Sequence, residues 1–432
     1  MSGGTGRTTL NTAGALARRG HDVEVVSVHR RRGRPFFPVP RRVKLRVLVD
    51  LYSLRRRAEG ALRTSPRTRL RLWAASRPSL VYTANDTRYH AFTLASDVRL
   101  MRYLRSVDDG VLVGTRPGLN IAIARWAQPS VVKVGQDHMN LGRYNPRLRG
   151  EIEKYYGGLD ALVTLTGGDG EEYASLLGDS ARVLAIPNGV PSVRGAVASP
   201  EQGNKIVIAA GRLSRQKGYD RLIRAWAIVA RKHPDWRLHI YGTPREPLRT
   251  ELQARIDKAG LGSVIYLMGV STRIHARMAE ASIYVLSSRF EGLPMALLEA
   301  MKIGLPVVAF NCPTGPADVI DHDRDGLLVE NGNVRALAAA IVALIEDPER
   351  RMQLGAAARV KAAEFDTDEI AVRWENLFTE LAAAKQPAGA TRSRSWFVAR
   401  LAAAILGGTL GALARKPPAT AARASRATIT AR

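Results

Sequence analysis

The chain has 432 residues, of which 46% are hydrophobic and 24% are charged, and its formal net charge is +26. This composition excludes a wholly disordered protein, and the length is sufficient for two domains with separate cores. The positive charge favours anionic partners, namely nucleotide-sugar phosphates, anionic lipid headgroups, anionic glycans or nucleic acid. Because Cys312 is the only cysteine, an intramolecular disulfide is excluded. The first residues are small and polar, so we expect no signal peptide and a cytoplasmic location.

Short apolar runs alternate with longer helical patterns from about Val23 to Glu330, which is typical of parallel α/β sheets. Right-handed crossovers bring the carboxyl ends of such strands to one edge, where ligands bind. The fold class is therefore α/β, with two Rossmann-like domains. Strands are expected at 23–28, 80–85, 110–115, 131–135, 161–166 and 183–187 in the first domain, and at 206–211, 237–242, 264–269, 283–288, 305–310 and 326–330 in the second.

The boundary between the domains is expected at 191–204, where Pro, Gly, Ser and Ala replace the apolar periodicity. This linker separates an N-terminal domain, residues 1–190, from a second domain, residues 205–364.

The tail, residues 385–432, is basic, and its first part is small and polar, which predicts partial disorder. Residues 396–414 are apolar but contain Arg400, so a membrane span is disfavoured. An interfacial helix flanked by arginines and a helix packed on the protein body are the two alternatives.

The most specific motif is FEGLPMALLEAM at 290–301, which follows an expected buried strand. Gly292 and Pro294 would open a helix whose free amides face an anion. Glu299 then lies about two turns into that helix, near the same face as Glu291. One carboxylate can accept hydrogen bonds from a sugar and the other from a ribose.

This string resembles the E-x7-E signature of retaining glycosyltransferases with the GT-B fold, in family 4 (glycosyl transferases group 1). In that fold, two Rossmann-like domains face each other across a cleft. The resemblance implies that Glu291, Gly292, Leu293 and Glu299 bind the donor. It covers roughly residues 2–384, and it identifies residues 365–384 as the family's last helix, which crosses back to the N-terminal domain.

Residues 210–218, AGRLSRQKG, resemble the family's strand-end loop, in which an arginine and a lysine hold the donor diphosphate. The resemblance assigns this role to Arg212 and Lys217. The chemistry fits, because a guanidinium and an ammonium neutralise the charge that grows on the leaving nucleotide.

The N-terminal residues Ser2 to Gly6, SGGTG, resemble the family's glycine loop, which approaches donor phosphate or acceptor and makes Gly3 and Gly4 candidates. The family's first strand should precede this loop, so that strand is expected to be missing. A P-loop is disfavoured because Arg7 follows the loop where lysine is needed, and no acid follows the next strand as a dinucleotide site requires.

His138 follows a strand where the family often has a cleft histidine that contacts the donor sugar; a plain turn histidine is the alternative. Asp137 is a candidate polar group on the acceptor side. The sequence CPTGP at 312–316 resembles a loop of subgroups that build bacterial surface glycans and teichoic-acid-type polymers, and it adds Thr314 and Gly315 as donor-binding candidates.

No metal site and no cofactor besides the nucleotide-sugar co-substrate are expected. Residues 321–326 imitate the start of a calcium loop, but the twelfth position is Gly332 instead of glutamate, which predicts a plain turn.

The expected function is that of a retaining glycosyltransferase. It moves a hexose-type sugar from a UDP-sugar to a cell-surface glycan, a lipid-linked acceptor or an anionic polymer, with His138, Glu291, Lys217 and Arg212 as the catalytic residues. The protein is expected to be cytoplasmic, with peripheral contact to an anionic membrane at the inner face of the plasma membrane. The alternatives are a catalytically inactive glycan-binding relative and a nucleic-acid-binding protein. The second is disfavoured because few aromatic residues lie among the arginines.

Overall fold

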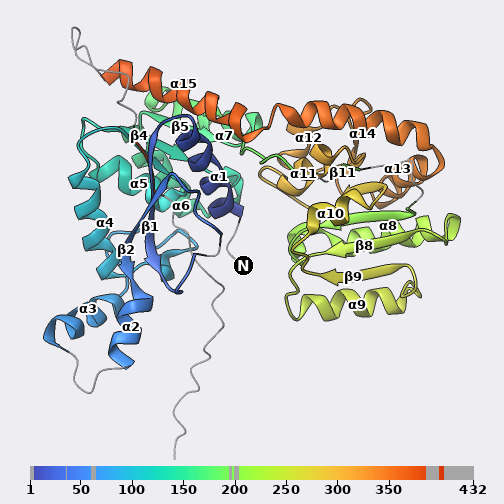
Figure 1. Ribbon diagram of the computed structural model, residues 1–432, viewed down its shortest axis with the longest axis horizontal. Helices are drawn as coiled ribbons and strands as arrows, with labels where there is room; N and C mark the ends of the chain where they lie inside the picture. Colours follow the sequence, from blue (N-terminus) through green and yellow to red (C-terminus); the bar gives the residue numbers. More distant parts are fainter. Residues whose placement is uncertain are drawn as a thin grey trace, which may run out of the picture.

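The computed structural model describes residues 4–35, 37–59, 65–193, 197–198, 204–385 and 398–402. The strands in these residues form two sheets, one of seven strands and one of six, each in its own lobe (Figure 1). All neighbouring strands of both sheets are parallel. The predicted α/β class is therefore confirmed.

The first lobe contains the seven-stranded sheet, in the order β2-β1-β13-β3-β4-β5-β6. Helices connect most of its successive strands, as is usual for parallel pairing, whereas the described residues between β1 and β2 contain no helix. The strands are β1 (Asp22–Arg30), β2 (Val43–Asp50), β3 (Val111–Gly114), β4 (Val132–Gln136), β5 (Ala161–Thr164), β6 (Val183–Ala185) and β13 (Val398–Ala402). The helices are α1 (Gly4–Arg18), α2 (Leu51–Glu59), α3 (Pro66–Ser76), α4 (Leu94–Ser106), α5 (Pro117–Trp126), α6 (Pro146–Tyr155) and α7 (Gly167–Leu177).

The third position of this sheet, between β1 and β3, is occupied by β13, a strand from the C-terminal end of the chain. Val398 to Leu401 pair with Asp22 to Val25 of β1, and Ala399 to Ala402 pair with Val111 to Gly114 of β3. In this sheet, β1 and β3 are thus separated by a strand from the other end of the chain. The described part of 396–414 is a strand where an interfacial helix was the expectation, and the rest of that stretch lies outside the described residues.

The strand predicted at 80–85 is wrong, because that backbone forms turns and bends. The cause is local: the Ser79 hydroxyl accepts hydrogen bonds from the Val81 and Tyr82 amides, and the Asp97 carboxylate accepts one from the Leu80 amide. Side chains thus satisfy the amides that a sheet ladder would use. The sequence reading also missed β2, an edge strand with alternating exposure.

The second lobe contains the six-stranded sheet, in the order β12-β11-β10-β7-β8-β9. The strands are β7 (Ile206–Ala210), β8 (Arg237–Tyr241), β9 (Ile265–Gly269), β10 (Ile283–Leu286), β11 (Val307–Asn311) and β12 (Leu327–Glu330). The helices are α8 (Tyr219–Lys232), α9 (Leu248–Lys258), α10 (Ile274–Ala279), α11 (Met295–Ile303), α12 (Pro316–Val319), α13 (Val334–Glu346) and α14 (Pro348–Ala363).

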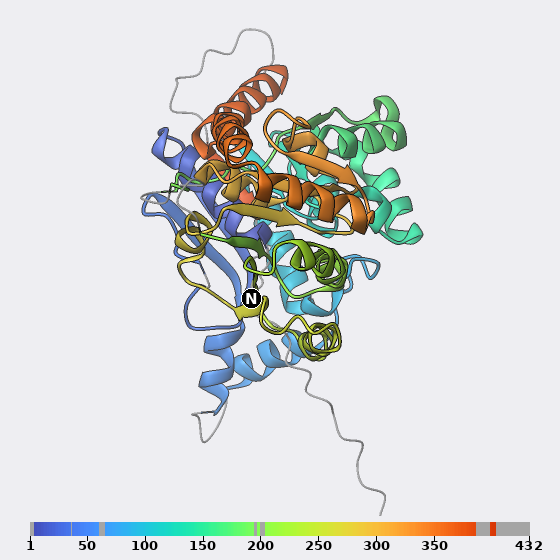
Figure 2. The same ribbon diagram turned by 90° about the vertical axis from the view of Figure 1, so that its right-hand side faces the viewer.

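Both sheets are buried between two layers of helices, because successive residues of a strand point to opposite faces. In β7, Val207 packs with α8, α9 and α13, whereas Ile208 packs with α10, α11 and α14. In β3, Val113 packs with α1, whereas Leu112 packs with α4, α5 and α6. Figure 2, turned by 90°, shows the second lobe with helices above and below its strands.

The last long helix, α15 (Thr367–Lys385), returns from the second lobe and packs on the first sheet (Figure 1). Trp374 and Phe378 lie buried against the strands, together with α1. Glu375 accepts hydrogen bonds from Arg19 and His21 at 2.7 Å each. Burial of two aromatic side chains, each worth about 1.5–3 kcal/mol, holds this helix to the first lobe.

We predict that Arg400→Pro, in the middle of β13, lowers the melting temperature by about 5 °C or more. The reason is that proline removes a backbone amide donor from an interior strand of the sheet. Arg400→Val keeps that donor and is the matched control. Thermal unfolding of the two variants and of the wild type tests this, and equal melting temperatures in all three would show that β13 adds nothing to the sheet.

Candidate active site

The carboxyl ends of β7 and β10 bring Lys217 and Glu291 together. Lys217 ends a short 3-10 turn after β7, and its Nζ lies 2.6 Å from Glu291 Oε1. The two side chains are only 15% and 7% exposed. Gly218 makes this approach possible: its φ is +63°, and a Cβ there would lie 2.0 Å from the Ser287 carbonyl oxygen.

Glu291 is fixed by its backbone as well as by its side chain. Its amide donates to the Pro313 carbonyl at 2.9 Å, and the Thr314 amide donates to the Glu291 carbonyl at 3.1 Å. The Ser288 hydroxyl and the Gln216 amide group also donate to its carboxylate. The loops after β10 and β11 therefore form one unit around this carboxylate.

Glu299 lies on α11, which begins at Met295 directly after Pro294. Its carboxylate is buried and has two cationic or polar partners that the sequence reading missed. Arg7 of α1 approaches Oε1 at 3.1 Å, and His275 Nε2 approaches Oε2 at 3.1 Å. Arg7 comes from the first lobe, so Glu299 joins the two lobes.

His138 lies just after β4, at the edge of the first lobe that faces the second. A Cβ on Gly292 would lie 2.9 Å from the His138 carbonyl oxygen, which shows how closely the Glu291 loop approaches. The imidazole Nε2 is buried and has no hydrogen-bond partner among the described residues. Burial, and then the charge of Arg116, lower the pKa of His138 to about 4, so the ring is neutral near pH 7.

Asp137 lies in a buried network of tyrosines. Its carboxylate accepts hydrogen bonds from the hydroxyls of Tyr144, Tyr173 and Tyr156, at 2.5, 2.7 and 3.3 Å. Burial raises the pKa of Asp137 to about 6. All these contacts are internal, so in this structure Asp137 supports the segment that carries His138.

Thr314 connects the two lobes. Asn140 Nδ2 donates to the Thr314 hydroxyl oxygen at 2.6 Å, and that hydroxyl lies 3.2 Å from Asp169 Oδ2. Nearby, the Gly167 amide donates to Asp318. Asn140 and Asp169 were not assigned a role from the sequence.

Arg212 lies at the end of β7, exposed, with no hydrogen bond or ion pair to any described residue. Its charge contributes, after burial and the charge of Arg116, to a lowered pKa of Arg88 in the first lobe. Arg116 is neutralised by Asp86, with contacts of 2.6 and 3.1 Å. Arg88 of the first lobe and Arg212 of the second therefore lie near one another. Neither guanidinium group has a side-chain partner among the described residues.

The remaining candidates lie in different environments. Leu293 is buried in the core beside α11. Gly315 has a φ of +96° and donates its amide to Asp318, and a Cβ there would lie 2.1 Å from the Gly292 carbonyl oxygen. Gly4 opens α1 and is exposed, and Gly3 lies outside the described residues.

Two protein-family models match this chain. Residues 2–194 match the model described as Glycosyltransferase Family 4, and residues 196–361 match Glycosyl transferases group 1. The two matches meet between the lobes, and together they include every candidate residue described above.

Similar proteins include an exopolysaccharide phosphotransferase of Streptomyces coelicolor, 35% identical over 88% of this chain. The chain spans only 39% of the length of that relative. A poly(ribitol-phosphate) alpha-N-acetylglucosaminyltransferase of Staphylococcus aureus is 30% identical over 41% of this chain and 36% of its own.

Among solved structures, S. aureus TarM, as a mutant in complex with fondaparinux, alpha-GlcNAc-glycerol and UDP, superposes with a TM-score of 0.69. The superposition covers 88% of this chain and 97% of TarM at 17% identity. It shows that the two lobes have the GT-B fold.

We predict that His138 makes the protein less stable in acid. Its pKa falls from 6.5 to about 4 on folding, so the unfolded chain binds the proton more readily as pH drops through that range. The free energy of unfolding should lose about 2 kcal/mol between pH 7 and pH 5 through this group alone. Urea titrations at both pH values should show a smaller loss in His138→Gln. Both proteins keep Asp137 and His29, and burial lowers the pKa of His29 to about 4 as well. An equal loss would therefore contradict the assignment to His138.

Proposed function

This chain belongs to the family 4 glycosyltransferases, and on that basis we propose that it transfers a hexose-type sugar from a nucleotide-diphosphate donor to a glycan acceptor, with retention at the anomeric carbon. The observation that carries the proposal is the buried ion pair between Lys217 and Glu291 at the carboxyl ends of β7 and β10. Burying two charges has a desolvation cost that an ion pair on the surface does not have. A buried pair at this position is therefore better explained by a role in function than by a role in stability.

The pair gives each partner a role toward the donor. Lys217, together with Arg212, would neutralise the diphosphate, and Glu291 would accept hydrogen bonds from the sugar hydroxyls. Glu299 would bind the ribose, displacing Arg7 or His275. A UDP-sugar is the proposed donor, supported by the UDP bound in the TarM complex.

The chemical step that we propose is attack on the face from which the nucleotide departs. The acceptor oxygen bonds to the anomeric carbon while the bond from that carbon to the diphosphate oxygen breaks, and the leaving phosphate takes the acceptor proton. His138, neutral near pH 7, would orient the sugar from the first lobe. The protein then contributes positioning and stabilisation of the leaving group, and the cations needed for this are side chains rather than a metal ion.

The acceptor that we propose is a cell-surface glycan or a lipid-linked or anionic polymer. Arg88 and Arg212 support it, because the charge of Arg212 contributes to the lowered pKa of Arg88, and two such guanidinium groups without a side-chain partner favour an anionic ligand nearby. The poly(ribitol-phosphate) specificity of the S. aureus relative points to the same acceptor chemistry.

The test of this function is hydrolysis and thermal stabilisation with a panel of UDP-, GDP- and ADP-sugars. One UDP-sugar should be hydrolysed slowly, with the same rate in EDTA, and Glu291→Ala should lose that activity. Well-folded protein that neither binds nor hydrolyses any donor would contradict the proposal and support a glycan-binding protein without catalytic activity.

Lys217→Ala should lower turnover about a hundredfold or more, because the leaving diphosphate loses its buried counter-charge. Lys205→Ala is the matched control, since Lys205 forms an exposed pair with Asp235. Turnover and melting temperature are measured for both variants. A Lys217→Ala enzyme with normal turnover would remove this residue from the mechanism.

A further inference from the structure

Helix α3 lies on the surface of the first lobe and has no buried residue. Leu70 is 64% exposed and Trp73 48% exposed, and Leu80, just after the helix, is 81% exposed. Figure 1 shows α2 and α3 extending beyond the first sheet, on the side away from the second lobe. Large apolar side chains gathered at one end of a lobe indicate an interaction surface.

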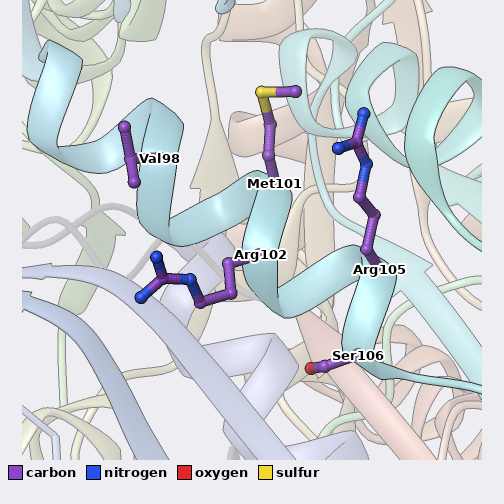
Figure 3. A pocket seen from close by; sticks show the side chains of 5 residues that line it. All are labelled: Val98, Met101, Arg102, Arg105 and Ser106. Carbon is purple, nitrogen blue, oxygen red and sulfur yellow. The ribbon is translucent and has the colours of Figure 1, made fainter.

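The neighbouring helix α4 continues this surface. Val98 is 51% exposed, and it lines a shallow hollow of about 500 Å³ with Met101, Arg102 and Arg105 (Figure 3). A second cavity of about 470 Å³ lies between β2, α3 and α4, and apolar atoms of Leu54, Leu70 and Val98 contribute to its lining.

The exposed charge of this region is positive, apart from Asp50, which lines the second cavity and is paired with Arg30. Between Ser65 and Val107 the only carboxylates are Asp86 and Asp97, and both are buried and hydrogen-bonded within the lobe. The next exposed carboxylate, Asp108, follows the end of α4. The exposed arginines around the apolar side chains are Arg67, Arg69, Arg71, Arg77, Arg99, Arg102 and Arg105.

We propose that α3, Leu80 and the outer face of α4 form a docking surface for an anionic lipid bilayer. The leucine, valine and tryptophan side chains enter the boundary between headgroups and acyl chains, and the arginines contact the anionic headgroups. No helix in the described part of the chain combines the length and apolarity that a bilayer crossing demands.

The composition favours a bilayer over two other occupants. A second copy of this surface would bring arginines against arginines without a carboxylate to compensate. Nucleic acid would pair with the arginines but would leave the exposed leucine and valine side chains in water. A bilayer satisfies both the charge and the apolar area, and its binding needs no sugar donor, so the proposal stands apart from the catalytic one.

The experiment is co-sedimentation of the full chain with vesicles of phosphatidylcholine alone and of phosphatidylcholine mixed with phosphatidylglycerol. The protein should bind the anionic vesicles, and binding should weaken as salt rises. Leu70→Ser/Trp73→Ser and Arg69→Gln/Arg71→Gln should each weaken binding about tenfold or more. The matched controls are Val360→Ser, which replaces another highly exposed apolar side chain, and Arg245→Gln/Arg249→Gln in the second lobe.

Wild-type binding by Leu70→Ser/Trp73→Ser, with the melting temperature unchanged, would overturn the proposal. Equal loss in the control variants would overturn it as well, because binding would then not depend on this particular surface. Binding of duplex DNA that competes fully with vesicles and is unaffected by the apolar substitutions would assign this surface to nucleic acid, and dimerisation abolished by the same substitutions would assign it to a second copy.

Discussion

The site depends on one constraint, the pair of backbone hydrogen bonds that joins Glu291 to the loop after β11. The Glu291 amide and carbonyl are both used, by Pro313 and Thr314, so the carboxylate is held before any ligand arrives. The glycines beside it allow this, because a Cβ at Gly315 would collide with the Gly292 carbonyl. A carboxylate held in this way needs little reorganisation when its partner changes, which is the condition for efficient electrostatic catalysis.

The same loop also joins the lobes. Thr314 uses its amide toward Glu291 and its hydroxyl toward Asn140 and Asp169 of the first lobe. Thr314 thus links the arrangement of the lobes to the conformation of the loop that holds the Glu291 carboxylate. Opening of the lobes would release these side-chain bonds, and with them the contact between Gly292 and His138. In a cleft enzyme, closure and assembly of the site are then a single event.

The parts of the fold and site that the sequence predicted are those that a short segment encodes. Apolar runs between helical patterns were sufficient for the α/β class, and the strings around Lys217 and Glu291 were sufficient to select both partners of the ion pair. Contacts between distant segments were not predictable in this way. Arg7 and His275 meet at Glu299 from two different lobes, and no spacing in the sequence relates them. The position of β13 beside β1 was not predictable for the same reason, because the two strands lie near opposite ends of the chain.

The arginines of the first lobe show why net charge alone says little about partners. Arg30, Arg46 and Arg116 each have a carboxylate partner, in Asp50, Glu24 and Asp86, and they serve the fold. The arginines of α3 and α4 have no exposed carboxylate within their own stretch, and apolar side chains lie among them. A positive field that is neutralised locally contributes little at a distance, whereas an unneutralised one attracts anions across the surrounding solvent. The formal charge of +26 therefore divides into a structural part and a part directed outward, and only the second bears on what this protein binds.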